Sequence, residues 1–381
     1  MKHFSIPASL AALALALALA AAGGAQAQGR TAVSLYGYLD TGIEHLTNVQ
    51  GAGSLTRMPG LTGTAPSRWG VRGSEDLGGG LSATFALESG LGLDAGTFNQ
   101  GGRGFGRQAW VGLNGPRGSV ALGRNYTMLY WALIEADLIG PNAFGLSSMD
   151  SYIPNARSDN SLAYRGRFGA WSLGATYSLG RDTVNAGPSP SGTHCAGETA
   201  SDSQACRQWS AMLKYDTAPW GLALAVDEMR GGVGAFAGLV RSELKDRRIM
   251  LNGYAMLTPT LKLGVGAIRR DNDGAAAATA ANGTAPRSTL AWAGLAWSPT
   301  RTVVVDGQLQ QLRYAQGGDR SSMLVLRSTY KFSPRTAAYA QIARMDNGDR
   351  LAISVSSAAV GGSPAPGAGQ TGLMLGLRHA F

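Results

Sequence analysis

Apolar residues alternate with small or polar residues along most of the chain, in segments of about ten residues. In segment 171–178, Trp, Leu, Ala and Tyr occupy every second position, and Ser, Gly, Thr and Ser lie between them. The same alternation recurs at 209–216, 261–270, 303–309 and 323–332. Successive side chains of a β-strand point to opposite faces, so a period of two predicts strands with one apolar and one polar face.

The connections between these segments fall into two classes that alternate along the chain. Short turns rich in Gly and Pro, which favour tight reversals, lie at 77–80, 115–118, 218–221, 257–260, 298–300 and 333–335. Long polar loops lie at 47–65, 93–104, 126–157, 181–206, 231–243, 271–286, 314–320 and 347–369. The alternation predicts that all long loops emerge at one end of the sheet and all short turns at the other.

This spacing predicts sixteen antiparallel strands. Their expected starts lie near Ala32, Ser67, Leu81, Arg107, Ser119, Asn160, Ala170, Arg207, Leu222, Asp246, Leu261, Arg287, Arg301, Ser321, Thr336 and Thr371. An even count brings both chain ends to the short-turn side, where the sheet can close, and a sheet in lipid must close because an open edge leaves backbone groups without partners. We therefore predict an all-β fold, a sixteen-stranded antiparallel transmembrane β-barrel. A soluble β-sandwich is the alternative, but it rarely uses so many strands in one domain.

The N-terminus has the pattern of a secretory signal peptide. A basic start at Lys2 precedes an apolar run at 6–22, and Ala25 and Ala27 supply the small residues that signal peptidase reads. We expect residues 1–27 to be a signal peptide and residues 28–381 to be the barrel domain. A membrane anchor is the alternative, but the small-residue site follows the apolar run directly. Because no later segment has 18 uninterrupted apolar residues, the sequence argues against helical membrane spans.

Charge and cysteine content refine this picture. The chain carries a net charge of +9, or +8 without Lys2. Its arginines are scattered singly through alternating segments of an exported chain, so nucleic acid is not an expected partner. Cys195 and Cys206 lie in one polar loop, and an exported chain enters an oxidising compartment, which favours a disulfide between them. Only His194 is nearby and no CxxC spacing occurs, so we expect no metal site.

Several segments together resemble the general porins of Gram-negative outer membranes, of the neisserial and related type. They are the first strand at 33–42, the second strand and turn at 67–78, the strand at 118–126 and the C-terminal segment at 376–381. The resemblance implies a homotrimer of sixteen-stranded barrels in the outer membrane, surrounded by lipid and lipopolysaccharide. It also implies short periplasmic turns, long extracellular loops and a third loop folded into the lumen. The terminal Phe381, after alternating leucines, resembles the signal read by the barrel-assembly machinery.

The function that this resemblance implies is passive diffusion of ions and small hydrophilic solutes, with a constriction formed by the third loop. That loop starts with apolar residues such as Tyr126 and Trp131, which a purely solvated loop would not carry, and this supports packing on the lumen wall. Asp137 occupies the position of a pore-facing carboxylate of the family. The family's second carboxylate is missing at 140–142, and Glu135 is a candidate substitute.

The opposite wall of the constriction is expected to be basic. Arg68 and Arg72 share one strand face, and an arginine in contact with lipid near the membrane centre costs about 2–4 kcal/mol, so both should point inward. Arg107 and Arg157 match other wall arginines of the family by position, Arg107 more closely. Any one of them could instead be a rim residue in water. Their excess over the acids predicts a modest preference for anions.

Arg124 follows the parity of Val120 and Leu122, which should point outward. An outward arginine is tolerable if a neighbouring subunit buries and pairs it, so Arg124 is a candidate subunit-interface residue. The alternative is that it lies high enough to extend into the loop region.

Three other functions can be weighed against a general porin. An enzyme of the barrel-hydrolase type needs a Ser–His pair. The barrel domain has only His45, His194 and His379 and no GxSxG segment, so we expect neither catalysis nor a cofactor. A structural barrel or adhesin predicts a filled lumen, whereas small residues at inward positions leave room for water. A substrate-specific outer-membrane channel of the same fold is the remaining alternative, with Tyr126, Tyr130 and Trp131 as candidates for an aromatic pocket.

Overall fold

The computed structural model describes residues 31–381, except for 154–155, 182–194, 196, 234, 236–237, 275–286, 316 and 359–360. The expected signal peptide at 1–27 and His194 lie outside the described residues. None of the helices in the described part of the chain is long and apolar enough to cross a membrane.

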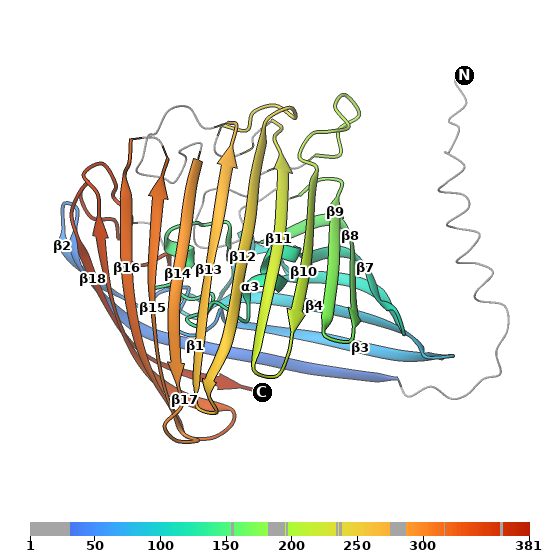
Figure 1. Cartoon of the computed structure of the whole chain (residues 1–381), viewed down its shortest axis with the longest axis horizontal. Coiled ribbons are helices and arrows are strands. Elements are labelled where there is room, and N and C mark those ends of the chain that lie inside the picture. The colour runs from blue at the N-terminus through green and yellow to red at the C-terminus, as the bar shows by residue number, and fades with distance from the viewer. Residues whose placement is uncertain are drawn as a thin grey trace.

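Sixteen long strands form the wall of a closed barrel (Figure 1). They are β1 (Ala32–Val49), β3 (Arg68–Gly78), β4 (Leu81–Gly92), β6 (Gln108–Gly115), β7 (Gly118–Tyr126), β8 (Arg157–Phe168), β9 (Trp171–Ser178), β10 (Gln208–Asp216), β11 (Trp220–Arg230), β12 (Lys245–Thr258), β13 (Leu261–Asn272), β14 (Arg287–Trp297), β15 (Val303–Tyr314), β16 (Arg320–Lys331), β17 (Thr336–Asn347) and β18 (Gln370–Ala380). The predicted fold class is confirmed, and each strand begins within three residues of its predicted start.

The loops add short elements to this wall. Strands β2 (Gly53–Arg57) and β5 (Thr97–Phe98) pair with the ends of β1 and β4. The helical pieces are α2 (Asn99–Gly102), α3 (Met128–Leu133) and the 3-10 turn η1 (Leu146–Ser148). The short turns lie at one end of the barrel, toward the bottom of Figure 1, as the alternation of connections predicted.

Strand β1 closes the barrel by pairing with a different neighbour along each half. Its first half runs antiparallel to β3, and its second half runs antiparallel to β18, with Tyr38 at the changeover. The backbone groups of Gly37 and Phe381 exchange two hydrogen bonds of 3.0 and 3.1 Å. The ring of Phe381 packs over Gly37, and a Cβ at residue 37 would force that ring to move. The terminal residue therefore takes part in closure; its role as an assembly signal stays a prediction.

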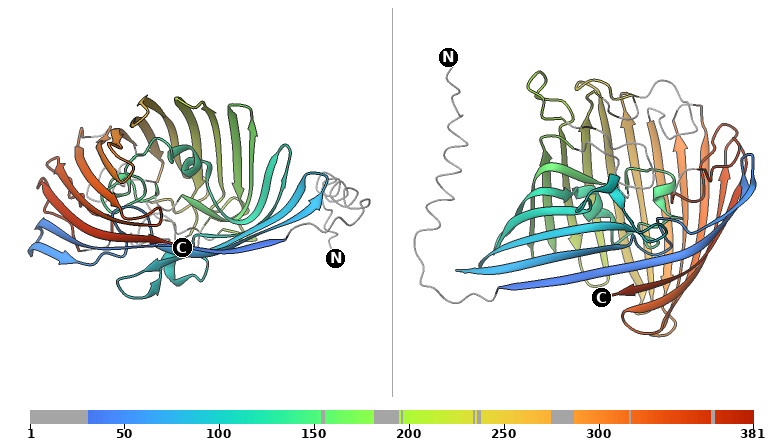
Figure 2. Two further views of the ribbon diagram at one scale, coloured as in Figure 1. Left: turned by 90° about the horizontal axis from the view of Figure 1, so that it is seen from below. Right: turned by 180° about the vertical axis from the view of Figure 1, so that it is seen from behind.

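The outer face of the wall is apolar and the inner face is mainly polar. Exposed side chains such as Val33, Leu122 and Leu375 alternate with inward residues along their strands. The hydrophobic core lies inside the lumen, where the loop between β7 and β8 (the third loop) packs on the wall (Figure 2). Its apolar residues meet inward side chains such as Met250 and Trp292, and the last loop packs against them. An apolar exterior around a polar, loop-filled interior is the arrangement of a membrane barrel.

Cys195 and Cys206 are bonded, with their Cα atoms 5.1 Å apart. The amide of Cys206 donates to the carbonyl of Gly231 at 2.8 Å, so the cross-linked loop is attached to the next long loop.

We expect peptide mapping without reductant to recover a single peptide pair joined through Cys195 and Cys206. A variant carrying both Cys195→Ser and Cys206→Ser should keep the single-channel conductance, because the strand hydrogen bonds hold the wall. Its cleavage by added protease between residues 195 and 206 should be faster, because the cross-link no longer closes that segment. Two free thiols in protein isolated from outer membranes would contradict this prediction.

Candidate pore constriction and lumen

Three of the four predicted wall arginines converge where the third loop leaves the wall. The Glu88 carboxylate accepts a hydrogen bond from Arg107 Nε at 2.7 Å, and Arg68 Nε lies 3.5 Å from its other oxygen. The Tyr126 hydroxyl accepts from Arg107 at 2.7 Å and from Arg157 at 3.3 Å. Glu88 was missed by the sequence reasoning, although it shares an inward parity with Ala86 on β4 and could have been found in that way.

Two arginines of this cluster, Arg107 and Arg157, are shielded from water and are engaged in contacts at the start of the third loop. Arg107 is 5% exposed and Arg157 is 2% exposed. The Arg157 guanidinium lies over the ring of Tyr126, 4.8 Å from its centre, and the ring of Tyr130 stacks on that of Tyr126 with 3.9 Å between ring centres. The two arginines therefore do not line open water as the prediction of a basic wall implied. Their positive charges lie next to the Tyr126 hydroxyl and not in open water.

Arg72 does face open space. Its guanidinium lies 5.2 Å from the ring centre of Tyr36, whose hydroxyl donates to Glu88 at 3.0 Å. It lines a lumen cavity of about 500 Å³ (the upper cavity), which also contains Arg165, Trp110, Tyr126 and Trp131. Among the described residues that line this cavity, none is acidic.

A second cavity, of about 440 Å³, continues toward the short turns. This lower cavity shares Asn114, Ser119, Trp131 and Arg165 with the upper one. Its lining adds Arg167 and Lys214, and again contains no acid among the described residues. Lys214 lies 3.5 Å from Asp216, whereas Arg167 donates to the carbonyl of Gly169. These basic residues were missed, although the parity of β8 places Arg165 and Arg167 on the lumen face.

The two predicted acids of the third loop lie across the lumen from the arginine cluster. Asp137 is buried and accepts hydrogen bonds from Gln308 at 2.9 Å and from the amide of Gly140 at 3.2 Å. Burial raises the pKa of the Asp137 carboxyl above its ordinary value. Glu135 is half-exposed and pairs with Lys262 at 3.0 Å. Neither acid therefore presents an unpaired negative charge to the open lumen.

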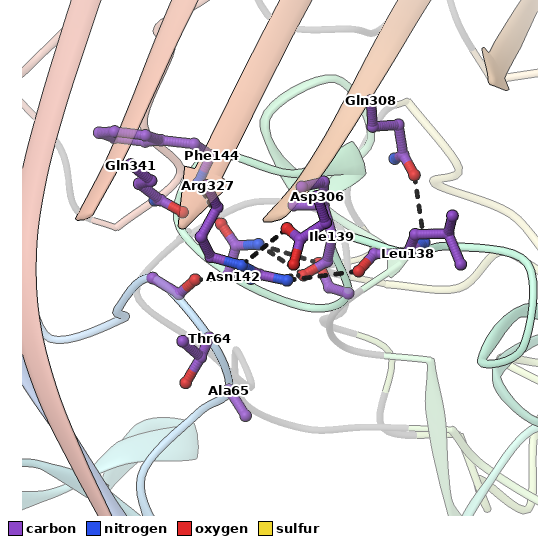
Figure 3. Close-up of polar contacts among 12 residues, drawn as sticks. Thr64, Ala65, Leu138, Ile139, Asn142, Phe144, Asp306, Gln308, Arg327 and Gln341 are labelled. Carbon is purple, nitrogen blue, oxygen red and sulfur yellow. Dashed lines mark hydrogen bonds and ion pairs between the residues drawn. The ribbon is translucent and has the colours of Figure 1, made fainter. Parts of the chain in front are cut away.

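Arg327 of β16 binds the third loop to the wall (Figure 3). It pairs with Asp306 of β15 at 2.9 Å and donates to the carbonyls of Gly63 at 2.8 Å and Ile139 at 3.0 Å. Next to it, Gln308 accepts from the amide of Leu138 at 3.2 Å. The wall thus supplies the partners that the irregular backbone of the loop needs inside the barrel.

A second attachment involves Asp150, near the end of the third loop. Asp150 pairs with Arg248 of β12 at 2.8 Å, and Arg248 also contacts Asp246 at 3.0 Å. Burial alone would raise the pKa of Asp150, but the charges of Arg248 and Arg270 outweigh it and lower the pKa. This carboxylate is therefore an anchor of the loop, away from the arginine cluster.

Arg124 is buried and paired within its own chain. Its Nε donates to the carbonyl of Gly106 at 2.7 Å, and a second nitrogen forms an ion pair with Asp159. Arg124 was expected either to be buried and paired by a neighbouring subunit or to extend into the loop region, and these contacts agree with the second alternative. The loop before β6 and the start of β8 supply the partners of Arg124. The residue therefore gives no evidence for an oligomer.

A closed barrel with an apolar exterior, and with a loop that narrows a polar lumen, defines an outer-membrane channel. The profile of the Gram-negative porin family matches residues 11–350, and the chain belongs to that family. It is 30% identical over 367 residues to "Outer membrane porin protein 32" of Delftia acidovorans, covering 92% of this chain and 95% of the relative. It is 32% identical to a Bordetella pertussis outer membrane porin over 218 residues, 53% of this chain and 55% of that protein.

Solved structures show the same fold. The "Anion-selective porin from Comamonas acidovorans" has a TM-score of 0.73 at 24% identity, covering 92% of this chain and all of that one. Outer-membrane OmpT of Vibrio cholerae has a TM-score of 0.63 at 12% identity, with 94% and 100% coverage. The expected outer-membrane porin is thereby confirmed as the class of the protein, and its location is the outer membrane of a Gram-negative bacterium.

Replacing Arg327 with Ala should loosen the third loop. The change leaves Asp306 buried without its partner, and breaking a buried pair in this way costs about 3–5 kcal/mol. We expect larger open-channel current fluctuations in planar bilayers and barrel unfolding at a lower temperature.

The matched control is Arg344→Ala, which removes an arginine from the exposed pair with Asp346 on β17. An exposed pair contributes little, so this variant should resemble the wild type. Equal behaviour of the two variants would contradict the role given to Arg327.

Proposed function

We propose that this porin is a general diffusion channel with a preference for anions. The observation that carries the proposal is the charge of the open lumen. The upper and lower cavities are lined by Arg72, Arg165, Arg167 and Lys214, with no acid among their described lining residues. Charges along a narrow, low-dielectric passage lower the barrier for counter-ions and raise it for ions of the same sign.

The positions of the acids support the same preference. Glu88 is neutralised by two arginines, Glu135 by Lys262, and Asp137 is buried with a raised pKa. Their negative charge is thus compensated locally, while Arg72 and Arg165 remain free of carboxylate partners among the described residues. The anion-selective porin of similar fold agrees with this reading.

The assembly of the protein is part of the proposal. Residues 1–27 are proposed to be removed on export, and the barrel is proposed to form homotrimers in lipid and lipopolysaccharide after insertion by the barrel-assembly machinery. A trimer form is described for Vibrio OmpT, which shares the fold. The family consists of channels, and we propose no catalytic role.

Changing Arg72 and Arg165 together to Ser should shift the reversal potential in a KCl gradient toward cation selectivity. Removing two unpaired charges from the passage should lower the anion-to-cation permeability ratio by about threefold or more. Raising the salt concentration should narrow the difference between variant and wild type, because ions screen the wall.

The control carries Arg344→Ser and Arg350→Ser, which remove the same charge from exposed ion pairs with Asp346 and Asp319. Its reversal potential should match that of the wild type. Cation selectivity of the wild-type channel would refute the proposed anion preference.

We expect the detergent-extracted protein to migrate as a trimer before heating and as a monomer after heating. Light scattering in the same detergent should give three chains per particle. The variant Arg124→Ala should still form trimers if folded, because its contacts are within the chain. A monodisperse monomer in mild detergent would contradict the trimer.

A further inference from the structure

We propose that the upper cavity is a binding site for small organic carboxylates that have an aromatic or otherwise apolar body. The inference deepens the proposed function, on which it rests: a general anion preference requires positive charge alone, whereas this site would also recognise the body of the solute. Its main residues are Trp110 and Trp131, which would contact that body, and Arg165 and Arg72, which would bind the carboxylate.

The two tryptophans are an unexpected lining for a water-filled lumen. Trp110 lies on β6 with Gln108 and Gly112 on the inward face, and its indole donates to Gln108 at 3.1 Å. Trp131 lies on α3, at the inner end of the third loop. Both rings are half-buried, so each is packed on one side and lines the cavity with the rest of its surface. Such rigid, amphipathic rings supply contact area at low entropic cost.

Arg165 supplies a cation that no carboxylate of the described residues neutralises. Its guanidinium lies 3.9 Å from the ring centre of Trp131. Stacking covers a face of the planar guanidinium but leaves the N–H groups at its edge available, and these match a carboxylate in bidentate geometry. Arg68 and Arg107 differ from it, because both are engaged with Glu88.

The placement of Arg165 and Trp131 favours contact with passing solutes. Both residues line the upper and the lower cavity, so they lie where the two meet. A volume of about 500 Å³ falls in the range of small-molecule sites. The unpaired arginines favour an anion, the absence of acids among the described lining residues disfavours a cation, and the indoles favour a planar apolar body over an inorganic ion.

The test uses the full-length mature porin in planar bilayers. The reversal potential in KCl is measured first, and then sodium benzoate, sodium acetate or neutral benzyl alcohol is added while the chloride current is recorded. We expect benzoate to reduce the current with a half-blocking concentration at least about tenfold lower than that of acetate, and benzyl alcohol to have little effect.

Single substitutions test whether benzoate blocks the current by binding in the upper cavity. Trp131→Leu and Trp110→Leu should each raise the half-blocking concentration of benzoate about fivefold, the loss expected for one aromatic contact. Arg165→Gln should raise the half-blocking concentrations of benzoate and acetate alike, because both solutes would bind through the carboxylate. The controls are Trp297→Leu, on the outer face of β14, and Arg301→Gln, in a short turn; both should be blocked like the wild type. Heat-dependent migration checks that each variant is folded.

The outcomes separate the two proposals. An anion-selective channel in which benzoate and acetate act alike refutes the carboxylate site and leaves the general function standing. A block by benzoate that survives both tryptophan changes also refutes the site. If a variant does not fold, quenching of wild-type tryptophan fluorescence by benzoate, compared with acetate, decides the question, and equal quenching overturns the site. Cation selectivity of the wild type refutes the proposed function itself.

Discussion

The structure depends on one constraint, that backbone polar groups within hydrocarbon must find partners inside the protein. The constraint requires a closed ring of strands, and the ring closes where β1 passes from β3 to β18. Period-two patterning follows, because each strand then has one face toward lipid and one toward the lumen. The chain reverses direction after every strand, so successive connections lie at opposite ends of the ring. The short turns lie at one end and the long loops at the other.

The same constraint applies again inside the barrel. The third loop brings irregular backbone into a confined space, and the inner faces of β10 to β16 provide its partners through groups such as Asn252, Gln308 and Arg327. Inner faces of strands between β1 and β10 border the two cavities, so β10 contributes to both sides. The wall is thereby divided: one side holds the loop, and the other side is available to solutes. The arginine cluster lies within the second side, where the third loop leaves the wall.

The strands were predictable from the sequence because their signal is local. Alternation and turn residues placed every start within three residues, and the parity of β3 placed Arg68 and Arg72 on the lumen side. The contacts of the third loop were not predictable, because they depend on which distant strand each loop residue meets. Asp137 was expected to face the pore and is instead buried against Gln308, 171 positions away. Arg124 was expected to point outward, but it is buried and paired with Gly106, in the loop before β6, and with Asp159, at the start of β8.

The closure by β1 also has a consequence for the order of events during synthesis. Residue 37 is made long before residue 381, yet their backbone groups must bond to each other for the ring to be complete. A chain that lacks β18 keeps two free strand edges, which invite pairing with other chains. Closure of the ring therefore has to wait until β18 has been made, and shorter translation products are open sheets prone to aggregation.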